Sequence, residues 1–245
     1  MRGNFLLCFF SVFYLLSPGS AWAQPGFSKG SCVLLDGQEL KGSFQLRLAT
    51  VQSPAILVYY DGKQEQQFEP VQVRRCMLGR RSYVVGGNFV APDDKGGLPV
   101  DHDFVEVLDT TGRVQLFRYD YEGYLGSYPG GYVLPAMAAA GAAVASGGTM
   151  LFMPMGGGPS YQKTYLLLLR AGPGQPMVPY SPGPRKGLFS TEQEKLIMPA
   201  VGATTDFFFE DEVLRKRIET GRLSPAQLPA AVRAYNQGVR LRAKD

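Results

Sequence analysis

The sequence predicts an α+β fold: an antiparallel β-sheet, or a partly closed barrel, built from hairpins and covered by C-terminal helices. Residues 30–119 contain strand-like runs with period 2, separated by turn signals. Each connection between neighbouring runs is too short for a crossover helix, which makes neighbouring strands antiparallel. Beyond residue 188, helix caps and apolar residues at helical spacing replace the alternation. We therefore expect a β-domain over residues 30–180 and a helical segment over residues 188–242.

Turn signals divide the β-region into four expected hairpins. Asp36-Gly37 and Asp61-Gly62 are dipeptides that favour tight two-residue turns, and Gly79 and Gly112 mark the other two connections. A later strand, residues 165–170, holds four consecutive leucines, which is typical of a strand buried in the middle of a sheet. The paired runs are 31–35 with 39–48, 55–60 with 63–68, 71–78 with 82–85, and 104–108 with 114–119.

Three short helices are expected in the C-terminal segment. Ser190 with Gln193 forms a capping-box signature for the first. Asp211 can cap a second helix that ends at Gly221. The last helix begins at Ser224-Pro225 or at Leu228-Pro229. These helices are individually too short to be stable alone, so they must pack on the sheet.

Residues 1–23 have the features of a secretory signal peptide. Arg2 precedes an apolar run over residues 5–16, and Ala21-Trp22-Ala23 fits a small-x-small cleavage site. We expect export, to the periplasm or the cell surface, after cleavage near Ala23. The mature chain would keep Cys32 and Cys76 in an oxidising compartment, where they could form a disulfide across the sheet or remain two buried free thiols.

The β-domain is interrupted by an unusual stretch, residues 123–162, that contains no Asp, Glu, Lys or Arg and is rich in Ala and Gly at its centre. We interpret it as a low-complexity insertion between two strands. The alternative is a membrane-attached segment at residues 134–155, which has roughly the length needed to span a bilayer. Its glycines and prolines weaken a helix, and no Lys/Arg clusters flank it. Peripheral membrane contact remains a second expectation for this stretch.

Composition limits the chemistry of the chain. It has 245 residues, 45% of them hydrophobic, a net charge of +4, three Cys and a single His. This charge is too weak to indicate a nucleic-acid partner, and one His leaves little for a metal cage or a Ser-His-Asp triad. Asp101-His102-Asp103 is the one cluster of metal-ligand types, and neighbouring residues of an extended segment point to opposite faces. We interpret it as a polar loop, and we expect no metal, no cofactor and no catalytic residue.

The leading hypothesis is a non-catalytic module that binds a protein or glycan of the cell envelope. Arg74, Arg75, Arg80 and Arg81 bracket Gly79 and form the densest basic patch. Guanidinium groups suit acidic glycans, lipid head groups or the acidic surface of a protein. The alternative is a charged hairpin rim that prevents edge-to-edge pairing of sheets.

A hydrolase is the competing hypothesis. Two carboxylates can hydrolyse a glycan without any His. Asp93-Asp94, Glu106, Asp109 and Glu122 are available, although their spacing does not show how far apart they lie. Solvated loops and strand faces are the simpler interpretation. The Phe207-Phe208-Phe209 run is expected to anchor the helices to the sheet; as an exposed patch it would bind a partner.

A series of short motifs follows along residues 30–238. They are Gly42 after the first turn, Phe68-Glu69-Pro70, residues 104–108, Leu116-Phe117-Arg118-Tyr119, residues 165–170 and Tyr235-Asn236. Their order resembles uncharacterised exported proteins of Bacteroidota-type bacteria, which carry a signal peptide, a hairpin-rich region and a closing helix with a Tyr-Asn pair. The resemblance implies an envelope location and a β-rich fold, and it implies no assigned reaction and no catalytic residue.

Overall fold

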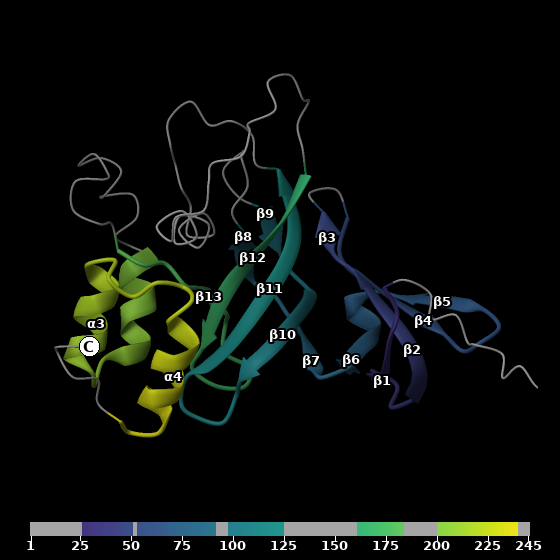
Figure 1. The fold of residues 1–245 in the computed structure, drawn as a ribbon, viewed down its shortest axis with the longest axis horizontal. Coiled ribbons are helices and arrows are strands. Elements are labelled where there is room, and N and C mark those ends of the chain that lie inside the picture. Colours follow the sequence, from purple (N-terminus) through teal and green to yellow (C-terminus); the bar gives the residue numbers. More distant parts are fainter. Residues whose placement is uncertain (1–25, 51–52, 92–97, 125–160, 184–199, 240–245) are drawn as a thin grey trace, which may run out of the picture.

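The computed structural model describes residues 26–50, 53–91, 98–124, 161–183 and 200–239, which form a long antiparallel sheet with helices at one end (Figure 1). This confirms the predicted α+β class. The sheet is not closed into a barrel, so the open sheet is the arrangement that forms. Its strands lie in the order β13 (Val178–Pro179), β12 (Tyr161–Arg170), β11 (Gln115–Tyr124), β10 (Asp103–Asp109), β7 (Arg81–Gly86), β6 (Val73–Leu78), β1 (Ser28–Leu34), β2 (Glu39–Arg47), β4 (Ile56–Tyr60) and β5 (Glu65–Phe68).

Four small elements complete the β-region. β3 (Ala49–Thr50) continues from β2 and pairs in parallel with β11 over two residues. β8 (Phe89–Ala91) and β9 (Leu98–Val100) form a separate antiparallel ribbon. A single 3-10 turn, η2 (Pro70–Gln72), links β5 to β6. Together these elements bring residues 49–54, 69–71 and 98–103 around one pocket.

All four predicted hairpins are present. The first turn shows why the Asp36-Gly37 dipeptide predicts a hairpin. Gly37 has φ +90°, a conformation that other residues rarely adopt. In the second turn the Asp61 carboxylate accepts hydrogen bonds from the backbone N–H groups of Lys63 and Gln64, at 2.8 and 3.0 Å. Such Asx contacts stabilise the turn locally, without help from the rest of the fold.

Two strands, β11 and β12, are buried on both faces and divide the interior into two clusters. On β12, Leu166 and Leu168 belong to a cluster formed with the β-region, and Leu167 and Leu169 belong to a cluster formed with the helices. The leucine run is therefore a buried strand, as predicted, but it lies next to the end of the sheet and not in its middle, since its outer neighbour β13 pairs only with Leu168 and Leu169. On β11 the first cluster receives Phe117, Tyr119 and Tyr121, and the second receives Val114, which precedes the strand, and Leu116.

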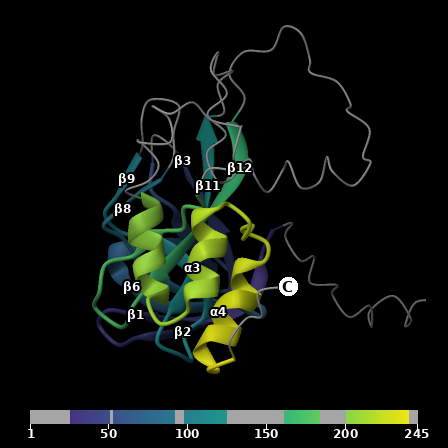
Figure 2. The ribbon, with the colours of Figure 1, turned by 90° about the vertical axis from the view of Figure 1, so that its left-hand side faces the viewer.

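The C-terminal segment lies against the β11–β12 end of the sheet (Figures 1 and 2). It comprises helical residues 200–205, the 3-10 turn η3 (Asp206–Phe208), α3 (Glu212–Glu219) and α4 (Leu228–Asn236). Asp211 caps α3 as predicted, accepting a hydrogen bond from the Leu214 N–H at 2.9 Å, and Gly221 follows its C-terminus. The last helix uses the Leu228-Pro229 start.

Two side chains fasten this segment to the sheet. Phe208 is fully buried in the second cluster, where its ring packs edge-on against Tyr235 with centroids 5.2 Å apart. The amide of Asn236 accepts a hydrogen bond from the Val114 N–H and donates one to the Val114 carbonyl, at 3.1 and 2.8 Å. Gly112 leaves room for this amide, since a Cβ there would lie 2.1 Å from its Cγ atom.

Several sequence-based expectations fall outside the residues the structure describes. They are the signal peptide, the Ser190–Gln193 cap and the proposed membrane segment at residues 134–155. Among the described residues, no helix has both the length and the apolar character needed to cross a bilayer.

The phenylalanine run gives a matched pair of variants. Phe208→Ala should lower the free energy of unfolding by about 3–5 kcal/mol, because it opens a cavity in the second cluster. Phe209→Ala should cost less than about 1 kcal/mol, since this ring is 60% exposed and only lies against the guanidinium of Arg113. Urea unfolding followed by circular dichroism measures both. Equal losses would contradict the assignment of Phe208 as the anchor.

The Asn236 amide can be tested in the same way. Asn236→Ala should cost about 1–3 kcal/mol, because it leaves the half-buried backbone groups of Val114 without their partners. Gln237→Ala, at the exposed neighbouring position, should be close to neutral. A neutral Asn236→Ala would show that water replaces the amide.

Candidate functional site

The structure separates the four arginines of the predicted basic patch. Arg74 and Arg75 lie on β6 and Arg80 lies in the turn before β7, and all three are exposed. Within the described part of the chain, none of the three has an ion pair or a side-chain hydrogen bond. Arg81 is different, because its guanidinium is bound by carboxylates of the chain itself, although its side chain is 43% exposed.

A β-bulge explains why two consecutive arginines face solvent. In the β1–β6 ladder Val33 lies opposite Arg75 and Leu34 lies opposite Val73, so Arg74 is an extra residue without a partner position. In a regular strand Arg74 and Arg75 would point to opposite faces. The bulge interrupts this alternation and leaves both exposed between the buried residues Val73 and Cys76.

Neighbouring side chains extend this surface. Lys29 on β1 is exposed and lies on the same side of the sheet as Met77, because Ser31, two residues further on, is the ladder partner of Met77. Met77 is itself 52% exposed. We call this surface the basic face. It consists of Lys29, Arg74, Arg75, Met77 and Arg80.

Arg81 belongs to an ion network with Glu106, Asp120 and Arg118. It donates two hydrogen bonds to the Glu106 carboxylate, at 2.8 and 2.5 Å, and one to Asp120 at 3.1 Å. Arg118 donates to the other oxygen of Asp120 at 2.7 Å. The hydrogen bonds to Glu106 are the main reason that the pKa of Arg81 is raised. These contacts use the guanidinium fork that a partner would otherwise bind.

The carboxylates considered for a hydrolase have separate structural roles. Glu106 is held by Arg81, and its side chain is only 12% exposed. Asp109 stabilises the β10–β11 turn by accepting hydrogen bonds from the N–H and hydroxyl of Thr111, at 2.9 and 2.7 Å. Glu122 lies on β11 opposite Lys163. Asp93-Asp94 lies outside the described residues, and none of the other three lines the pocket.

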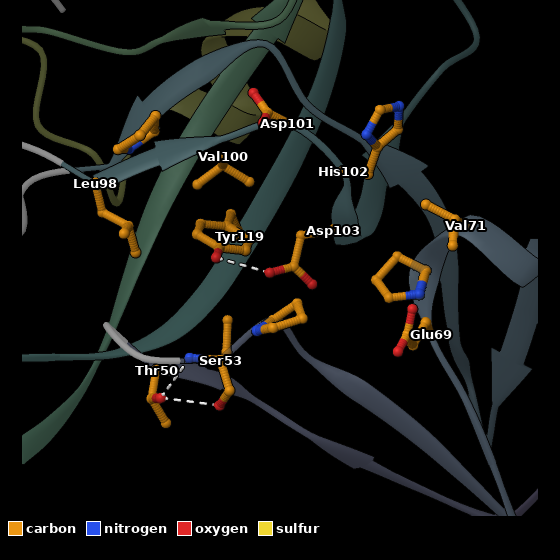
Figure 3. Close-up of a pocket in the computed structure, with 14 residues that line it drawn as sticks. Thr50, Ser53, Glu69, Val71, Leu98, Val100, Asp101, His102, Asp103 and Tyr119 are labelled. Carbon is orange, nitrogen blue, oxygen red and sulfur yellow. Dashed lines mark hydrogen bonds between the residues drawn. The ribbon is translucent and has the colours of Figure 1, made fainter.

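The pocket has a volume of about 410 Å³ and opens between β3, η2, β9 and the start of β10 (Figure 3). Its ionisable lining residues include Glu69, Asp101, His102 and Asp103. Asp101 and His102 are exposed in the loop before β10, as the polar-loop interpretation predicted. In the part of the chain that is described, no three His, Cys, Asp or Glu side chains are grouped to hold a metal ion.

Asp103 is the buried acid of this pocket. Its carboxylate accepts hydrogen bonds from the Phe104 N–H at 2.7 Å and from the Tyr119 hydroxyl at 2.9 Å (Figure 3). The side chain is almost inaccessible, and burial raises its pKa despite these donors. Burial also raises the pKa of Tyr119. The sequence analysis placed Asp103 in a polar loop and missed its pairing with Tyr119, because the two residues are 16 positions apart and only the pairing of β10 with β11 brings them together.

The two cysteines lie opposite each other. Cys32 on β1 is the ladder partner of Cys76 on β6, and both are buried free thiols. Burial raises the pKa of Cys32 to about 11 and that of Cys76 to about 12. The thiols are therefore protonated and unreactive while the two strands stay paired.

Asp103 makes stability depend on pH. Because its pKa is higher in the folded state, the folded protein gains stability from the bound proton at low pH and loses it as pH rises from about 4 through the raised pKa. Asp103→Asn should remove this loss. Tyr119→Phe should enlarge it, because the hydroxyl lowers the pKa of Asp103. Unfolding free energies at pH 4 and pH 8 measure both effects; an unchanged pH dependence in Asp103→Asn would contradict this assignment.

Comparisons with known proteins place no relative beside this chain. No protein-family model, no curated protein and no solved structure matches it. The resemblance to uncharacterised exported proteins therefore remains a prediction. The geometry of the basic face and of the pocket is the available guide to function.

Proposed function

We propose that the chain is an exported, non-catalytic module of the cell envelope that binds an anionic partner, a glycan or a protein, on its basic face. One observation carries the proposal. Arg74, Arg75 and Arg80 are exposed close together along the chain, and within the described residues no intramolecular partner uses their guanidinium groups. The guanidinium fork matches carboxylate and phosphate oxygens in a bidentate geometry.

The position of these arginines in the sheet supports binding over edge protection. Strand β6 is paired on both sides, by β1 and β7, and β7 is paired on both sides by β6 and β10. Charges that block edge-to-edge association belong on strands with an unpaired side. Arg74 and Arg75 are on an internal strand, so this explanation does not account for them.

The bulge further supports a binding role. A regular β6 would expose one arginine of the pair and direct the other to the opposite face of the sheet, where a charge needs a partner. The bulge places both on solvent, next to the exposed apolar side chain of Met77. A face that combines exposed guanidinium groups with an exposed apolar side chain can contact both the charges and the carbon framework of a ligand.

A hydrolase needs two carboxylates on one cleft. Of the carboxylates named from the sequence, Glu106 is engaged by Arg81 and Asp109 by Thr111, and neither lines the pocket. The carboxylates that do line it are Glu69, Asp101 and Asp103, and Asp103 already accepts hydrogen bonds from the Phe104 N–H and the Tyr119 hydroxyl. We therefore propose binding without turnover. Degradation of a purified envelope glycan by the full chain would overturn it.

Binding can be tested with two variants that lose the same charge. Arg74→Gln/Arg75→Gln/Arg80→Gln should lose about tenfold or more in affinity for an immobilised acidic polysaccharide and for solubilised native envelope, because each lost arginine removes a charged hydrogen-bonding group. Lys216→Gln/Arg222→Gln/Arg233→Gln removes three exposed charges from the C-terminal segment and should bind like the wild type. Surface plasmon resonance at 0.15 M salt measures both.

The two variants distinguish binding by the basic face from binding driven by the net charge of the protein. Equal weakening in both triple variants would show that net charge alone drives binding. Wild-type binding to neither ligand would also contradict the proposal. The carbonate wash of isolated membranes then tests the alternative of membrane attachment, because it releases a protein held only by a peripheral partner.

A further inference from the structure

We propose that Cys32 and Cys76 form a disulfide that joins β1 to β6. The inference is independent of the proposed binding partner. It concerns a covalent bond within the fold, and its supporting observations are the strand register and the burial of both thiols.

The hydrogen-bond pattern of the β1–β6 ladder identifies the kind of site the cysteines occupy. The Gly79 N–H donates to the Lys29 carbonyl at 2.8 Å, which makes Lys29 and Gly79 a hydrogen-bonded pair. Hydrogen-bonded and non-hydrogen-bonded pairs alternate along an antiparallel ladder. Counting along the register, Ser31 with Met77 is hydrogen-bonded and Cys32 with Cys76 is not.

A non-hydrogen-bonded pair brings opposing side chains closest. Its Cα atoms lie about 4.5 Å apart. Disulfides require Cα separations of about 4.4–6.8 Å, so the backbone already has a spacing that a disulfide accepts. The exposed fractions of Cys32 and Cys76 are 0% and 3%, which places both sulfur atoms in the interior beneath the two strands.

The bond forms by thiol–disulfide exchange with an oxidised donor, such as a dithiol oxidoreductase of the envelope or glutathione disulfide. The thiolate of one cysteine attacks a donor sulfur and releases one donor thiol. The second cysteine then attacks the mixed disulfide and releases the other donor sulfur as a thiol. The cysteines lose two electrons and two protons in total, and the donor gains them. Burial suppresses both thiolates in the folded protein. The exchange therefore takes place during folding, before β1 and β6 are stably paired.

Peptide mapping tests the bond directly. The full chain is refolded in a mixture of reduced and oxidised glutathione, alkylated and digested with trypsin. Cleavage after Lys29, Lys41, Arg75 and Arg80 yields the peptides Gly30–Lys41 and Cys76–Arg80. We expect these two peptides joined, at a mass 2 Da below their sum, and separated again by dithiothreitol.

Thermal unfolding gives a second readout. The oxidised protein should melt about 5–15 °C above the reduced protein, because the bond closes a long loop in the unfolded chain. The Cys32→Ala/Cys76→Ala variant should show no such dependence on oxidation.

Three results would overturn the proposal. One is complete alkylation of Cys32 and Cys76 after oxidative refolding to the native circular dichroism spectrum. The others are a glutathione adduct on either residue as the stable product and linkage of either residue to Cys8. The mapping uses the wild-type chain, so it remains decisive even if the double variant does not fold.

Discussion

Burial of both faces of β11 and β12 is the constraint on which the rest of the structure depends. Each of these strands supplies alternate side chains to the two clusters. Both clusters therefore depend on the same two strands being in place. Full burial of one leucine stabilises a fold by about 1.5–3 kcal/mol, and β12 contributes four in a row. The helices cover one side and the β-region covers the other, and the basic face consists of the exposed side chains of β1, β6 and the turn after β6, whose alternate residues are buried in the first cluster.

Local signals made most of the fold predictable. The turns at Gly37 and Gly62 and the cap at Asp211 each depend on contacts within a few residues, and each was found from the sequence. The partners of Arg81 were not predictable from local signals. Arg81 meets Glu106 and Asp120, which are 25 and 39 residues away, and only the strand order brings them together.

The same reason explains what was missed at the pocket. Its walls come from residues 49–54, 69–71 and 98–103 and from Tyr119, which are well separated in the chain, and the buried Asp103 lies among them. The sequence predicts an exposed polar loop at Asp101-His102-Asp103, and the structure confirms this for the first two residues. The third is buried because strand β10 begins there and turns its side chain toward Tyr119.

The hydrogen bonds between Val114 and Asn236 have a consequence for the order in which the chain is completed. The two residues are 122 positions apart, so β11 is synthesised long before α4. Until the C-terminal segment is synthesised, the face of β11 and β12 that carries Leu116 and Leu167 is apolar and open to water. Non-local contacts of this kind form late, and apolar surface that can aggregate stays exposed until they do. A nascent chain of this protein therefore needs residues 200–239, or a chaperone in their place, before its sheet is shielded from association.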